Sequence, residues 1–171
     1  LVARGLDDEL KGTAFAVIDG VDGRTHHVRL ADLDAAGDSA PGSIVELRKF
    51  YDARGQRRVA LAVRSDLAIE QQITASGATW LDRQAIAREP VALGGAGFGA
   101  EVRHAMDARA EHLIGQGLAE RQARGVSFRP GLIETLRQRE LNALAKQLTT
   151  EIGRPLTDRK STRLNSSHRH R

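Results

Sequence analysis

The sequence predicts an α+β fold in which a small antiparallel β-barrel-like subdomain precedes a helical, winged-helix-like one. Residues 1–64 contain short apolar or alternating segments separated by turns rich in Gly, Asp and Pro, which is typical of strands. From about residue 67 onward, apolar residues recur every three or four positions, as on one face of a helix. The 171 residues include no cysteine, so disulfides, cysteine-bound metals and thiol chemistry are excluded.

Two hairpins account for most of the first part. Residues 12–19 and 24–30 are predicted strands, and the Asp-Gly pair in the turn between them favours a tight reversal. After a polar loop, residues 43–51 and 57–64 form a second predicted hairpin. Strands at this spacing are typical of a small barrel or curled sheet.

Short helices follow the strands. Ser65 or Asp66 is expected to cap a first helix, which ends at Gly77. Thr79 is expected to cap a second helix that stops before Pro90. Trp80, the single tryptophan, is predicted to be a core anchor joining the two halves.

The last third is predicted to be helical with one hairpin. A helix is expected at about residues 100–114, a short hairpin at 118–128, and a last helix from Gly131 that ends at Gly153 and Pro155. The residues expected to face inward from this last helix are Ile133, Leu136, Leu141, Leu144, Leu148 and Ile152.

The chain therefore divides into a β subdomain (1–64), connecting helices with a Gly-rich linker (65–98), a helical subdomain with a hairpin (99–157) and a tail (158–171). The tail, DRKSTRLNSSHRHR, resembles read-through of a sequencing adapter, so we expect it to be non-native and disordered. Its five basic residues and one acidic residue account for the whole net charge of +4, because residues 1–157 hold 21 of each sign. The start at Leu1 suggests an internal fragment.

No catalytic or metal site is expected. His26 and His27 are neighbours on a strand and point to opposite faces, while His104 and His112 lie two helical turns apart. Tyr51 lacks a nearby base or metal to activate it. The carboxylate groups at 7–9 and at Asp32 and Asp34 are expected to be solvated loop charges.

The Gly95–Ala100 segment matches the G-x-G-x-x-A pattern that lets backbone amides approach a pyrophosphate. No βαβ unit surrounds it, so we expect a linker and no bound cofactor. A nucleotide-binding enzyme using this loop stays as an alternative.

The segment from residue 112 to 145 has the order helix, hairpin, helix, as in winged DNA-binding modules. Arginines on a wing and on a helix face can reach phosphates. Acidic residues are interleaved with them, so a protein-interaction module without DNA contact is the other alternative. The expected DNA-binding residues are Arg121, Arg124, Arg129, Arg137, Arg139 and Lys146.

Several blocks of the sequence are similar to the downstream region of bacterial conjugative relaxases, which are mobilization nucleases. These blocks are residues 1–10 (LVARGLDDEL), 14–20 (AFAVIDG), 23–28 (GRTHHV), 64–67 (RSDL), 77–83 (GATWLDR), 97–102 (GFGAEV), 109–113 (RAEHL) and 136–141 (LRQREL). In such proteins a domain of unknown function follows an N-terminal nuclease.

The resemblance implies a cytoplasmic, non-catalytic accessory region in plasmid transfer. The parent protein would be a DNA-nicking transesterase, whereas its tyrosine nucleophile and histidine metal cluster have no counterpart in this chain. The implied partners are DNA and conjugation or transfer proteins, with no membrane span and no cofactor.

Overall fold

The computed structural model describes the backbone of residues 3–8 and 13–168, and side chains at 14–32 and 34–151. Contacts group the chain into two units. Unit 1 comprises residues 1–75 and 79–132, and unit 2 comprises 76–78 and 133–171. Helices and small antiparallel sheets are both present, so the predicted α+β class is confirmed. The domain divisions expected at residues 64, 98 and 157 stay predictions.

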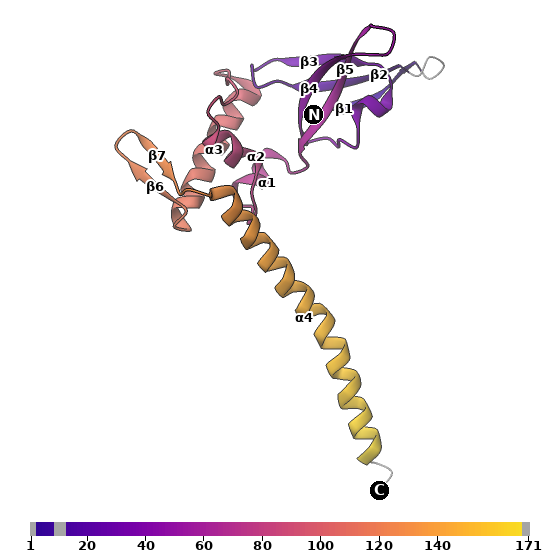
Figure 1. Ribbon diagram of the computed structural model, residues 1–171, viewed down its shortest axis with the longest axis vertical. Coiled ribbons are helices and arrows are strands. Elements are labelled where there is room, and N and C mark those ends of the chain that lie inside the picture. Colours follow the sequence, from indigo (N-terminus) through magenta and orange to yellow (C-terminus); the bar gives the residue numbers. More distant parts are fainter. Residues whose placement is uncertain (1–2, 9–12, 169–171) are drawn as a thin grey trace. The chain divides into compact units, whose positions relative to one another are not determined.

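Five strands in unit 1 form two separate antiparallel sheets (Figure 1). The first has the order β1 (Ala3–Asp8), β2 (Thr13–Asp19), β3 (Thr25–Leu30), and the second pairs β4 (Ile44–Tyr51) with β5 (Arg57–Ser65). The two predicted hairpins are confirmed, but the described strands show no closed barrel. Strand β1 was not predicted, because its polar sequence becomes a strand only through pairing with the edge of β2.

Small residues form the centre of the first sheet. Ala14, Ala16 and Ile18 on β2 are buried and lie opposite Leu30, Val28 and His26 of β3. This face packs with Ala36, from the short 3₁₀ helix η1 (Leu33–Ala36), and with Leu61 of β5. Alanines at two core positions allow the neighbouring elements to approach the sheet closely.

Three helices of unit 1 pack on a second apolar cluster. They are α1 (Ile69–Ile73), α2 (Trp80–Ile86) and α3 (Gly97–Gly115). The buried residues are Ile44, Ile69, Leu81, Val102 and Ala105. Because Ile44 belongs to β4, this cluster joins a strand and the helices within unit 1. Leu81 is the fully buried anchor, whereas Trp80 is half-buried at the edge of the cluster.

The Gly-rich stretch predicted to be a linker is closely packed. The Gly94 amide donates to the Val21 carbonyl at 2.6 Å. A Cβ on Gly94 would lie 2.7 Å from the Asp22 carbonyl oxygen, and one on Gly99 would overlap the Val21 oxygen. The glycines thus allow α3 to begin against the turn between β2 and β3. Close backbone contact therefore accounts for Gly94 and Gly99, whereas Gly95 has open space around it.

The chain continues through a short hairpin into a long helix. Strands β6 (Ala119–Gln122) and β7 (Gly125–Phe128) pair as predicted. Helix α4 (Leu132–His168) then runs as one continuous coil (Figure 1). The predicted end at Gly153 and Pro155 is wrong, because the helix continues past both residues. An interior proline removes one backbone donor and crowds the carbonyl group four residues earlier, which weakens a helix locally, but the hydrogen bonds of the turns on either side can still continue it.

Most of the expected inward face of α4 is exposed. Ile133 and Leu136 are buried, whereas Leu141, Leu144 and Leu148 are between 49% and 60% exposed. Ile152 lies outside the described side chains. Spaced at i, i+3 and i+7, the three exposed leucines form a stripe that we call the α4 leucine stripe. No helix in the described part of the chain is long and apolar enough to cross a membrane.

Candidate nucleic-acid interface

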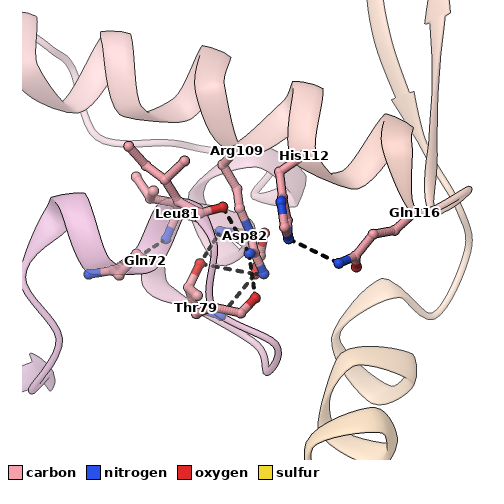
Figure 2. A network of polar contacts seen from close by, with 9 residues as sticks. Gln72, Thr79, Leu81, Asp82, Arg109, His112 and Gln116 are labelled. Atoms are coloured by element: carbon pink, nitrogen blue, oxygen red, sulfur yellow. Dashed lines mark hydrogen bonds and ion pairs between the residues drawn. The ribbon is translucent and has the colours of Figure 1, made fainter.

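A buried ion pair holds the helices of unit 1 together (Figure 2). Arg109 on α3 is 2% exposed and Asp82 on α2 is fully buried, and the two side chains form a bidentate contact at 2.9 and 3.0 Å. The third guanidinium nitrogen of Arg109, Nη1, donates to the carbonyl oxygens of Ile73 and Ala75, at 3.2 and 2.6 Å. One guanidinium therefore connects α2 and α3 with the segment that follows α1.

Thr79 completes this network. Its hydroxyl accepts from the Asp82 amide, as an N-cap, and donates to the Asp82 carboxylate at 2.9 Å. Gln72 anchors the other side, because its side chain accepts from the Leu81 amide and donates to the Leu67 carbonyl. None of the described buried side-chain polar atoms lacks a partner. The network is fully satisfied internally, so its role is structural.

Only part of the predicted DNA-binding set is brought together. Arg121 lies on β6 and forms an ion pair with Glu111 of α3. Arg124 is in the β6–β7 turn and Arg129 directly follows β7. Both side chains are exposed and have no ion-pair partner among the described residues.

The other three predicted residues lie on α4, in unit 2. At 100° per residue, Arg139 and Lys146 share one face of the helix, while Arg137 points to the opposite face. All three are exposed. The helix therefore does not present them as one row of cations.

The histidines and carboxylates have local partners. The His26 ring lies 2.9 Å from the Asp22 carboxylate, and the His27 ring stacks on Phe15 at a centroid distance of 5.3 Å. His112 contacts the side chain of Gln116 at 3.0 Å (Figure 2). Asp32, expected to be a solvated loop charge, caps η1 by accepting from the Ala35 amide. The described residues include no group of three that could hold a metal ion.

The β4–β5 hairpin carries a concentration of positive charge that sequence reasoning missed. Residues 44–65 contain six basic and two acidic residues. Both acids are paired, Asp52 with Arg58 at 2.9 Å and Glu46 with Arg64. The basic residues without an ion-pair partner in the described chain are Arg48, Lys49, Arg54 and Arg57. The run of cations around residues 48–58 is visible in the sequence, but only pairing shows which of them are uncompensated.

The turn of this hairpin is held rigidly by Asp52. Its carboxylate accepts from the backbone amides of Arg54 and Gln56 and from the Arg58 side chain, each at 2.9 Å. The Arg58 side chain is the largest influence holding the pKa of this carboxyl below its usual range, followed by the amide of Gln56. Gly55 supplies the positive φ of 76° that closes the turn. Arg54 is thus presented on an ordered loop.

A groove in unit 1 is a further surface feature. It encloses about 660 Å³ and is lined mainly by apolar side chains. Two charge pairs at its lining, Asp22 with His26 and Glu46 with Arg64, are already satisfied within the protein. Its apolar lining residues are Ile18, Val21, Ile44, Val45, Leu47, Trp80, Val91 and Phe98.

Comparison with known proteins finds one family. A family model described as a protein of unknown function (DUF3363) matches residues 1–50 and 47–166. The chain belongs to the DUF3363 family. The match extends into the basic tail, so the foreign origin of residues 158–171 stays a prediction. No curated protein and no solved structure matches the chain.

Within this DUF3363 chain, three of the sequence blocks compared with relaxases above supply buried or closely packed residues. The block 77–83 supplies Thr79 and Asp82, the block 109–113 supplies Arg109, and the block 97–102 supplies the closely packed Gly99. These three blocks therefore contribute to the hydrogen-bonded and packed interior of unit 1.

Proposed function

We propose that this chain is an accessory region of a conjugative relaxase, acting in the cytoplasm, which positions DNA while a separate nuclease domain nicks one strand. The sequence blocks similar to relaxases support the context. Two of these blocks supply the buried residues Thr79, Asp82 and Arg109, which supports a scaffolding role in place of a chemical one. The order α3, β6–β7 hairpin, α4 is compatible with a winged-helix-like use of the hairpin as a wing.

The observation that carries DNA contact is the exposure of Arg124 and Arg129 on the β6–β7 hairpin, without acidic partners among the described residues. Arginines in this state gain favourable contacts with phosphates and lose no internal ion pair on binding.

The test is binding of the full chain to a fluorescein-labelled 20-base-pair duplex over a range of salt concentrations. The double variant Arg124→Glu/Arg129→Glu is expected to bind more weakly and to reduce the slope of log K against log salt by about 2, at about 0.9 per lost phosphate contact. The control is Arg83→Glu/Arg88→Glu, which changes the same charge at exposed arginines elsewhere in unit 1. The proposed contact is contradicted if both double variants weaken DNA binding equally, or if neither of them weakens it.

A second candidate function is docking of a transfer protein. The α4 leucine stripe favours it, because three exposed leucines on one helix face are costly to leave in water. Sedimentation equilibrium of the full chain and of Leu144→Lys tests the stripe. If the stripe mediates association, the chain self-associates or binds a purified transfer protein, and the variant does neither.

A further inference from the structure

The outer end of the β4–β5 hairpin combines uncompensated charge with an exposed aromatic ring. In the ladder, Tyr51 pairs with Arg57 and Lys49 pairs with Val59. Directly opposed residues of an antiparallel pair lie on the same face, and alternate residues of a strand do too. Lys49, Tyr51 and Arg57 therefore project from one face, with Arg54 at the adjoining turn.

The burial of side chains on this face decreases along the hairpin toward the turn. Val45 and Val59 on this face pack against the cluster that contains the buried Leu61. Lys49 lies opposite Val59, and the pair of Tyr51 and Arg57 lies one step farther toward the turn; Lys49, Tyr51 and Arg57 are all exposed. The outer segment thus extends past the core that anchors it, and its side chains are available to a ligand.

The Tyr51 side chain has no hydrogen-bonding or stacking partner in the described part of the chain. Its side chain is 75% exposed, the largest value among the exposed large hydrophobic residues of the described part of the protein. No described residue stacks on its ring or bonds its hydroxyl. The ring shares its face of the hairpin with Lys49 and Arg57, and its exposure leaves room for a planar ligand to stack on it.

We propose that this end of the β4–β5 hairpin binds single-stranded nucleic acid, with Tyr51 stacking on a base and Lys49, Arg54 and Arg57 contacting the flanking phosphates. Stacking of a side chain on a base needs an unpaired, accessible base, and a duplex interior does not offer one. A rigid turn that holds Arg54 in place lowers the ordering cost of the contact. The site is separate from the β6–β7 hairpin and does not depend on the DNA contact proposed there.

The same chemistry also suits an anionic membrane surface, but the composition of the face favours a nucleic acid. Membrane association through a hairpin requires several apolar side chains that enter the lipid. At the outer end of this face one ring accompanies Lys49 and Arg57, with Arg54 at the turn, while the exposed Phe50 lies on the opposite face and Leu47 and Val63 lie farther from the turn. This arrangement matches alternating bases and phosphates better than a lipid surface.

The experiment compares the full chain with variants for binding to fluorescein-labelled (dT)12 and to a 12-base-pair duplex. Tyr51→Ala is expected to bind (dT)12 about 5- to 150-fold more weakly, from the usual contribution of one stacked base, and to bind the duplex unchanged. Tyr51→Phe keeps the ring and is expected to bind (dT)12 within about twofold of the unaltered chain. The basic C-terminal residues are common to all variants and cancel in these comparisons.

Charge variants test the phosphate contacts. Lys49→Gln/Arg57→Gln is expected to weaken binding to (dT)12 and to reduce the salt slope by about 1.4, at about 0.7 per contact on a single strand. Arg88→Gln, at an exposed arginine outside the hairpin, is the control and is expected to leave the slope unchanged. Photocrosslinking of 5-iodouracil-containing DNA should label the tryptic peptide of residues 50–54.

Three results would overturn this inference. They are equal loss of (dT)12 and duplex binding in Tyr51→Ala, failure of Tyr51→Phe to bind, and binding of the chain to anionic phosphatidylglycerol vesicles but not to (dT)12. A result in which Arg124→Glu/Arg129→Glu has no effect while Tyr51→Ala loses (dT)12 binding rejects only the contact proposed for the β6–β7 hairpin. The reverse result rejects only the Tyr51 site.

Discussion

Replacing Asp82 by alanine is expected to destabilise this protein severely. Asp82 accepts four hydrogen bonds at 2.9–3.0 Å, two from the Arg109 guanidinium and two from the amide and hydroxyl of Thr79. The variant leaves the Arg109 guanidinium, which is only 2% exposed, without its counter-ion, while its contacts with the carbonyl oxygens of Ile73 and Ala75 remain. Breaking one partner of such a buried pair costs about 3–5 kcal/mol in free energy of unfolding.

That loss is a large fraction of the total, because a typical domain is stable by about 5–15 kcal/mol. At this chain length it corresponds to a fall in Tm of roughly 6–20 °C. The measurement is urea unfolding followed by circular dichroism, with Asp107→Ala as the control. Asp107 is an exposed carboxylate on α3, and its loss is expected to change the free energy of unfolding by about 0.5 kcal/mol or less.

The double variant Asp82→Ala/Arg109→Met tests the reason for the loss. Removing both charges leaves no uncompensated buried cation, so the double variant is expected to be about 1–3 kcal/mol more stable than the sum of the single losses predicts. A loss below about 1 kcal/mol in Asp82→Ala, or strictly additive single losses, would refute the argument that the pair acts as one buried unit.

Three further outcomes test the fold around these surfaces. Gly99→Ala is expected to lower the free energy of unfolding by about 1–3 kcal/mol, because its Cβ would overlap the Val21 carbonyl oxygen. Gly95→Ala has open space around it and should have little effect. Thermal unfolding of the two variants makes the comparison. Thr79→Ala is expected to cost about 0.5–2 kcal/mol through the lost N-cap of α2, and Thr79→Ser should recover most of it in the same assay. The lowered pKa of Asp52 stabilises the folded hairpin at pH values above the ordinary aspartate pKa, and this stabilisation is lost as pH falls through the lowered pKa. Asp52→Asn is expected to remove this pH dependence of stability, and an NMR titration of the unaltered chain should show the lowered pKa. A normal pKa for Asp52 would contradict the argument.

Local sequence signals were sufficient for most of the elements. The hairpins of residues 12–30 and 43–64, the capping of α2 by Thr79 and the β6–β7 hairpin follow from turn chemistry and short-range periodicity, and the structure has them all. Strand β1 and the length of α4 were missed. The first depends on pairing with a neighbouring strand, and the second depends on how far an established helix continues past Gly153 and Pro155.

For the candidate site, too, some features follow from the sequence and others only from the folded structure. The sequence alone determined the types of residue available, which are many arginines, no cysteine and a single tyrosine. Only the tertiary structure decided which of them are free to act. It buried Arg109 against Asp82, paired Arg121 with Glu111, and left Tyr51 and its neighbouring cations exposed beyond the core. The physical reason is that ion pairing and burial depend on residues far apart in the chain, such as positions 82 and 109, whose approach no local pattern encodes.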